Sequence, residues 1–123
     1  MNEAIRSLYQ SVEARLPAGF SFADFERAIA DWEVIPVMEG GEVIGAVMVK
    51  GNELHVGFSR QGACIRGEIK RIFKPLLQKF GELVTTVCAD NKRGLSFCKR
   101  LGFEEIEMSG GVVKMRCTGC KYA

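Results

Sequence analysis

The chain has 123 residues, 47% of them hydrophobic, which is enough for one compact domain with a buried core. It carries 17 Lys and Arg against 15 Asp and Glu, and the net charge of +2 is too small to indicate a nucleic acid or an anionic membrane as a partner. No apolar stretch approaches the roughly 20 residues of a membrane-spanning helix, and the N-terminus lacks an apolar signal core. We therefore expect a single domain over residues 1–123, located in the cytoplasm and without membrane contact.

The cysteines indicate neither disulfides nor a metal centre. Cys64, Cys88 and Cys98 fall in a predicted loop, strand and helix, where single reduced thiols pack well. Cys117 and Cys120 form one CxxC pair, but the chain has one His and no second such pair. Because a closed zinc site needs four ligands, we predict no metal.

The first half of the chain predicts two helices and then three strands. Residues 4–16 carry apolar side chains at helical spacing, and Pro17 ends this amphipathic run. Ser21 is typical of an N-cap and predicts a short helix over residues 22–31. Pro36 cannot donate to a neighbouring strand, so it indicates an edge or a bulge. The three strands are predicted as an antiparallel meander over residues 32–38, 43–50 and 53–59.

A strand, a helix and a second strand follow in close succession. Apolar residues alternate along residues 53–59, and a continuous apolar stripe runs along a helix over residues 65–80, in which Pro75 predicts a bend. Gly81 ends that helix, and residues 83–88 form a β-branched run suited to the interior of a sheet. We therefore predict parallel pairing of the two strands, with the start of the helix at the sheet edge where α/β proteins bind ligands.

The segment after these strands carries a family resemblance. Asn91 begins a short helix, Phe97 lies within it, and Leu-Gly-Phe at residues 101–103 ends it before a hairpin over residues 103–117. This segment resembles the closing motif of the GNAT superfamily of N-acetyltransferases, and the order of elements agrees over residues 33–117. The resemblance implies an α/β fold with a mixed sheet, the GNAT-like acyl-CoA N-acyltransferase fold. Because a helix is predicted at residues 4–16, before any strand, we expect the first strand of the family to be absent from this sequence.

The resemblance also implies a cofactor site. In GNAT enzymes the pantetheine of acetyl-CoA enters between the two parallel strands, and its pyrophosphate rests on N–H groups at the start of the following helix. The implied cofactor contacts are Phe58, Ser59, Arg60, Gly62, Ala63, Cys64, Ile65, Arg66, Gly67, Asn91 and Arg93. The loop departs from the family pattern, because Ala63 and Ile65 stand where that pattern has Gly and then Gly or Ala. The basic residues near this edge either hold a polyphosphate or form solvated helix faces.

Acetyl transfer needs a base, an oxyanion donor and an acid. His55, and to a lesser degree Glu53, is the candidate base, with a structural His as the alternative. Cys98 occupies the position where family members often have a Tyr that acts as the general acid. Cys98 either takes this role or only packs in the core. The oxyanion donor would be a backbone N–H within residues 57–59, and Asn91 either contacts the cofactor or caps the last helix.

Two functions follow from these residues. The first is an acetyl-CoA-dependent N-acetyltransferase that acts on an unidentified amine of a small molecule or a protein. The second is a non-catalytic GNAT-like binding or structural module that has lost acetyl-CoA binding, as in compact relatives that include some encoded by bacteriophages. The altered loop and Cys98 motivate the second. Self-association through an edge strand or the last hairpin is expected to be feasible.

Overall fold

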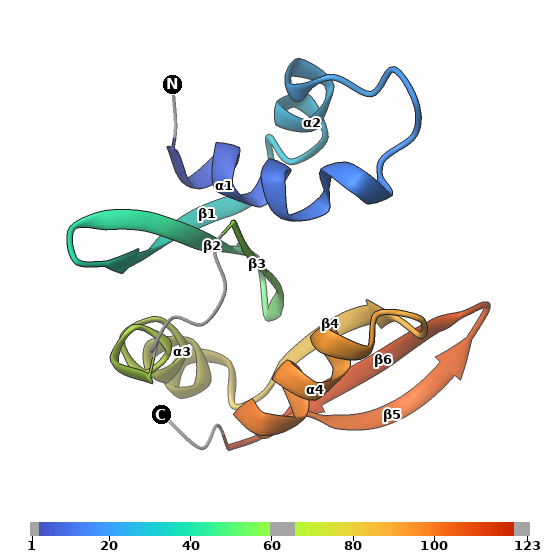
Figure 1. Ribbon diagram of the computed structural model, residues 1–123. Coiled ribbons are helices and arrows are strands. Elements are labelled where there is room, and N and C mark those ends of the chain that lie inside the picture. The colour runs from blue at the N-terminus through green and yellow to red at the C-terminus, as the bar shows by residue number, and fades with distance from the viewer. Residues whose placement is uncertain (1–2, 60–65, 120–123) are drawn as a thin grey trace. The chain divides into compact units, whose positions relative to one another are not determined.

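The computed structural model describes residues 3–59 and 66–119. Its elements are α1 (Glu3–Val12), a 3₁₀ turn (Glu13–Arg15), α2 (Phe22–Ala28), β1 (Glu33–Glu39), β2 (Glu42–Lys50), β3 (Glu53–Phe58), α3 (Arg66–Phe80), β4 (Leu83–Cys88), α4 (Lys92–Leu101), β5 (Glu104–Ser109) and β6 (Val112–Cys117) (Figure 1). The strands form one six-stranded sheet in the order β1-β2-β3-β4-β6-β5. The predicted mixed α/β fold is confirmed.

Strand directions agree with the predicted connections. β1 and β2 are antiparallel, with an irregular register between Val37 and Met38. β1 is also an outer strand, so Pro36 lies on an edge strand next to a bulge, as its missing N–H predicts. β3 and β4 are parallel through the pair Glu53 and Val84, as expected for strands joined by a helix. β6 pairs antiparallel with both β4 and β5, which confirms the final hairpin.

The helix ends have local causes. α1 gives way to a 3₁₀ turn after Val12, and Leu16 is extended (φ −81°, ψ 152°) because the residue before a proline avoids helical conformation. Ser21 is the N-cap of α2, and its hydroxyl and the Asp24 carboxylate form a capping box. α2 ends at Ala28, three residues before the predicted end.

The chain divides into two compact units, and each is described by itself. Within the described residues the first holds 3–51 and 55–59, and the second holds 52–54 and 66–119, so that the division falls inside β3. That residues 1–123 form one domain stays a prediction. Among the described residues, no helix is long and apolar enough to cross a membrane.

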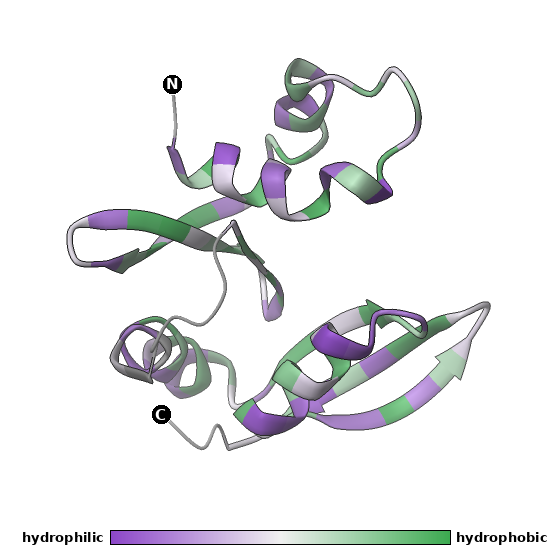
Figure 2. Cartoon of the chain, viewed as in Figure 1, coloured by the Kyte–Doolittle hydropathy of each residue, from purple (hydrophilic) through white to green (hydrophobic). Residues whose placement is uncertain are grey.

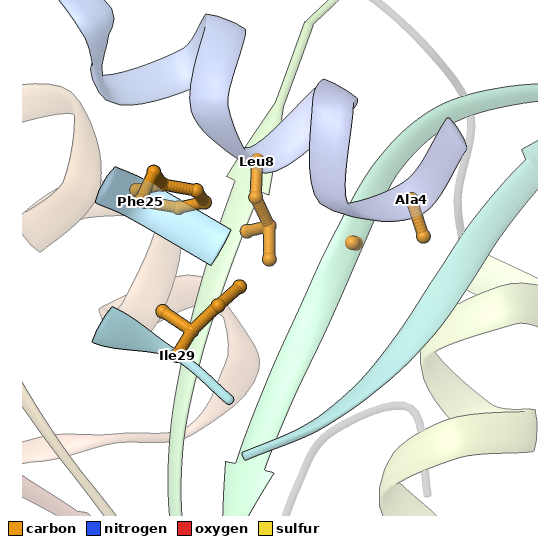
Figure 3. Packing of buried hydrophobic residues seen from close by; sticks show 5 residues of the cluster. Ala4, Leu8, Phe25 and Ile29 are labelled. Atoms are coloured by element: carbon orange, nitrogen blue, oxygen red, sulfur yellow. The ribbon is translucent and has the colours of Figure 1, made fainter. Parts of the chain in front are cut away.

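The core of the first unit lies under α1 and α2. Ala4 and Leu8 of α1, Phe25 of α2 and Ile29, the C-cap of α2, are buried together with Ala46 of β2 (Figure 3). β2 has a continuous buried stretch and is mostly apolar in Figure 2. Burial of apolar surface between β2 and the two helices α1 and α2 therefore holds these helices on the sheet.

The second unit follows the alternating pattern of a sheet with one covered face. In β6 the buried residues Val113, Met115 and Cys117 alternate with exposed ones. Leu95 and Leu101 of α4 are buried as well. Within this unit the apolar face of the strands and the apolar stripe of α4 supply the core.

Candidate functional site

The C-terminal end of β3 is enclosed by its neighbours in the first unit. A Cβ atom at Gly57 would come within 3.0 Å of the Ser11 Cβ and 3.2 Å of a Leu8 methyl group, so α1 lies directly on the backbone of β3. A Cβ atom at Gly45 of β2 would come within 2.6 Å of the Phe58 ring. Because neighbouring residues of a strand face opposite sides, α1 covers Gly57 on one face and Phe58 lies over Gly45 on the other.

Ser59 ties this strand end to β2 and to α1. Its N–H donates to the Ile44 carbonyl at 2.9 Å, and its hydroxyl donates to the same oxygen at 3.2 Å. The hydroxyl of Ser7, a buried residue of α1, donates to the Ser59 hydroxyl at 2.8 Å. The Ser59 N–H is therefore committed to β2. That another backbone N–H among residues 57–59 serves as oxyanion donor stays a prediction.

His55 packs beside an aromatic ring. The centroid of its imidazole lies 5.5 Å from that of Trp32, with the two rings tilted at 60°, and the Lys50 ammonium lies 5.8 Å from the centroid of the Trp32 ring. If His55 has a structural role, its packing partner is therefore Trp32. Glu53, the second candidate base, is the β3 residue that pairs with Val84 and belongs to the other unit.

Asn91 and Arg93 lie at the start of α4. The Asn91 side-chain oxygen accepts the Gly94 N–H at 3.1 Å, so the structure places Asn91 as the N-cap. A Cβ atom at Gly94 would meet the Asn91 amide nitrogen at 2.5 Å and a Val87 methyl at 3.1 Å, which explains the glycine. Arg93 is exposed in the first turn. Contact of either residue with a cofactor stays a prediction.

Cys98 lies one turn from the end of α4. Burial raises the pKa of its thiol to about 11, so the thiol stays protonated at neutral pH. The Cys98 carbonyl accepts the Phe103 N–H at 3.0 Å, the Lys99 carbonyl accepts the Gly102 N–H at 3.1 Å, and Gly102 is left-handed (φ 111°). These bonds form a Schellman motif, and the burial of Leu101 and Phe103 confirms that this end of α4 is pinned to the core.

The start of α3 belongs to the predicted pyrophosphate site. Arg66 is the first residue of α3, and a Cβ atom at Gly67 would have nothing within 4 Å, so packing does not require this glycine. The other predicted loop residues, Arg60, Gly62, Ala63, Cys64 and Ile65, lie outside the described residues. The candidates thus divide between the units: His55, Phe58 and Ser59 in the first, and Glu53, Arg66, Gly67, Asn91, Arg93 and Cys98 in the second.

The structure adds residues that sequence reasoning missed, namely Ser7 and Gly45. A signal for Ser7 was present, because Ala4, Leu8 and Ser11 share its helical stripe and small side chains there permit close approach to a strand. Over residues 3–59 and 66–119, no group of three His, Cys, Asp or Glu residues could hold a metal ion. Cys88, Cys98 and Cys117 are free thiols.

The arrangement of helices and strands is the GNAT acyl-CoA N-acyltransferase fold. No protein-family model matches the sequence, and no curated protein matches it. Solved structures do resemble the chain. The ribosomal-protein-alanine N-acetyltransferase of Brucella melitensis has a TM-score of 0.68 and 16% identity over 95% of this chain and 93% of its own.

Two further structures agree. A mutant of the spermidine N-acetyltransferase from Vibrio cholerae has a TM-score of 0.69 and 17% identity, covering 98% of this chain and 92% of its own. The PaiA N-acetyltransferase of Thermoplasma acidophilum, in complex with coenzyme A, has a TM-score of 0.60 and 14% identity over 94% and 88% of the two chains. These likenesses establish the fold.

Proposed function

We propose that the protein is an acetyl-CoA-dependent N-acetyltransferase that acts on an amine acceptor. The observation that carries this proposal is the parallel pair β3 and β4, joined by α3, within a sheet shared with N-acetyltransferases. One of these structural neighbours is a complex with coenzyme A. The acceptor, a small molecule or a protein, is part of the proposal.

The described residues fit an acyl-CoA in two places. In the second unit, N–H groups of the first turn of α3 would hold an anion, and a Cβ atom at Gly67 would have nothing within 4 Å. In the first unit, a backbone N–H near the end of β3, within residues 57–59, would donate to the acetyl carbonyl oxygen. When bound, acetyl-CoA would supply the activated acetyl thioester.

The other candidates have defined roles. His55, or Glu53, would take the proton of the acceptor ammonium, and Cys98 would donate a proton to the leaving thiolate. Because its pKa is raised to about 11, the Cys98 thiol is protonated at neutral pH but is a weak acid. We therefore assign Cys98 a smaller contribution than a free thiol would give.

Isothermal titration with acetyl-CoA tests the proposal. We expect binding to the unaltered chain, and at least about tenfold weaker binding to Gly67→Asp, because a carboxylate at the start of α3 repels a pyrophosphate. Gly119→Asp is the matched control, since it adds the same charge at another glycine with open space around it, and it should bind normally. Absence of binding at millimolar acetyl-CoA would end the catalytic proposal.

The alternative is a GNAT-like binding or structural module without acetyl-CoA. Two observations favour it: the buried thiol of Cys98 at the position of the acid, and the packing of His55 against Trp32. This alternative predicts a folded chain that gives no heat with acetyl-CoA. The same titration, accompanied by a circular dichroism spectrum, therefore separates the two functions.

A further inference from the structure

The two helices of the second unit are strongly basic. α3 has five Lys and Arg residues against one Glu, and α4 has four and no acidic residue. The helices of the first unit differ, because α1 and α2 together have two Arg residues against three acidic ones. The small net charge of +2 therefore does not describe the second unit, whose helices carry a concentrated positive charge.

The basic side chains lie on the outer side of each helix. In α3, Lys70 and Lys74 are exposed and one turn apart, whereas Ile72 and Phe73 are buried. In α4 all four basic residues are exposed, and Leu101 is buried. We define the cationic helix face by six of these exposed residues, Lys70, Lys74, Lys79, Lys92, Arg93 and Arg100.

α3 and α4 lie on the same side of the sheet. β4 and β5 are both antiparallel to β6 and hence parallel to each other, and β3 is parallel to β4. Connections between parallel strands are right-handed, and the strand order β3-β4-β6-β5 advances from β3 to β5 in one direction. The two connecting helices therefore cover one side of the strands, and their outer sides form one surface.

The opposite side of the same strands carries two basic residues that serve as a reference. Val87 pairs with Val113, and a Cβ atom at Gly94 of α4 would lie 3.1 Å from a Val87 methyl group, so α4 covers the side that bears Val113. Lys114 and Arg116 are exposed and alternate with buried residues of β6, so they lie on the side away from α4.

The composition of the cationic helix face fits a nucleic acid rather than a membrane or a protein. Every exposed side chain that the structure describes on α4 is polar or charged, whereas membrane insertion needs apolar side chains and protein interfaces centre on aromatic anchors. Lys and Arg contacts to phosphates supply most of the affinity for nucleic acids without reading the bases.

The scarcity of aromatic residues favours a duplex over a single strand. Single strands are held by stacking of their bases on aromatic side chains. Among the described residues of α3 and α4, Phe80 is the one aromatic residue classed as exposed, and the Lys79 ammonium lies 5.2 Å from the centroid of its ring. A duplex presents phosphates instead of base faces, which matches a surface of cations.

We propose that the cationic helix face binds the phosphate backbone of a double-stranded nucleic acid without reading its sequence. α3 has 15 residues and is about 22 Å long, which corresponds to about six base pairs of a duplex. The inference does not depend on the proposed function, because Lys70, Lys74 and Arg100 are not among the predicted cofactor contacts.

Fluorescence anisotropy of a labelled DNA duplex of about 24 base pairs tests the proposal. We expect the full chain to bind with a dissociation constant of about 1–100 μM at about 50 mM salt, and the affinity to fall steeply as salt is added. Lys74→Gln combined with Arg100→Gln should weaken binding at least about fivefold and make the salt dependence shallower, because each lost phosphate contact lowers the log–log slope by about 0.9.

Lys114→Gln combined with Arg116→Gln is the matched control. It removes one Lys and one Arg from the other side of the same strands, so the net charge changes equally, and it should stay within about twofold of the unaltered chain. Circular dichroism checks that both variants fold. If Lys74→Gln with Arg100→Gln does not fold, Lys70→Gln with Lys79→Gln takes its place and must show the same selective loss.

Four results would overturn the inference. They are absence of binding at about 200 μM protein and about 50 mM salt, equal weakening by the two double variants, tighter binding of a single strand of the same length, and displacement of the duplex by poly-L-glutamate at equal charge. The last result would indicate an acidic protein as the partner. Because the assay contains no acetyl-CoA, failure of the proposed acetyltransferase function would leave its outcome unchanged.

Discussion

The surroundings of Cys98 control its acidity and its effect on stability. Desolvation by burial favours the neutral thiol, which raises the pKa from 9.0 to about 11. In the unfolded chain the same thiol is in water and loses its proton near the lower value. The protonation of Cys98 is thus linked to folding.

The first prediction concerns alkaline pH. Below pH 9 the folded and the unfolded protein both keep the Cys98 proton, so the difference in pKa has no effect on stability. Between pH 9 and about 11 the unfolded protein alone loses this proton. The free energy of unfolding therefore falls as the pH rises. We expect this thiol to lower the free energy of unfolding by about 2–3 kcal/mol over that range. Urea unfolding of the unaltered chain and of Cys98→Ala at several pH values measures it.

The exposed Cys88 provides the control for this measurement. Cys88→Ala should follow the pH dependence of the unaltered chain, whereas Cys98→Ala should show a shallower decline. Parallel curves for all three proteins would mean that Cys98 is as accessible to water in the folded state as in the unfolded state.

At the scale of elements, α3 contains a local conflict. Its residues continue through Pro75, which has no N–H to donate to the Arg71 carbonyl and whose ring crowds the preceding turn. Pro75 is exposed, so its ring gains little from burial. The helix persists because Ile72 and Phe73, in the turn before Pro75, are buried.

The second prediction is that Pro75→Ala stabilises the protein. We expect the free energy of unfolding to rise by about 1–3 kcal/mol, because alanine restores the hydrogen bond and is the best helix former. Chemical denaturation measures the change. Lys74→Ala, at the exposed neighbouring position, should stay within about 0.5 kcal/mol. A loss of stability in Pro75→Ala would indicate that a bend in α3 is required for its packing.

The elements were predictable where local chemistry determines them. Helix caps depend on the side chain or backbone of a single residue, so they can be predicted from sequence. The examples are the N-caps Ser21 and Asn91 and the left-handed C-cap Gly102. The end of α2 was not predictable, because no Gly or Pro marks it. Ile29 follows Ala28 and is buried in the core, so tertiary packing ends the helix and leads the chain into β1.

The candidate site was less accessible to sequence reasoning. The close approach of α1 to Gly57, and of Phe58 to Gly45, depends on pairs of segments that meet only in the folded chain. A glycine in a strand signals such an approach but does not name its partner. The hydroxyl of Ser7 likewise had no predictable partner, because hydrogen bonds between distant side chains carry no sequence period.

At the scale of the molecule, the sheet has two outer strands that differ in their protection. β1 carries Pro36 and a bulge, both of which discourage pairing with another chain. β5 is exposed throughout, including Ile106 and Met108, and is mostly hydrophilic in Figure 2. Its acidic residues are Glu104, Glu105 and Glu107. We infer that these charges limit pairing at the β5 edge, although self-association of the unaltered chain stays a prediction.

The third prediction follows from this charged edge. Replacing Glu104, Glu105 and Glu107 together by Gln removes the repulsion between two β5 strands and leaves Ile106 and Met108 exposed, so the variant should associate more strongly than the unaltered chain. Sedimentation equilibrium over a range of concentrations measures this. The matched control replaces three exposed glutamates of the helical segments, Glu3, Glu13 and Glu26, by Gln, which changes the net charge equally and should leave the mass unchanged. Equal association of both variants would assign the effect to net charge, and association of neither would show that the shape of the β5 edge protects it without its charges.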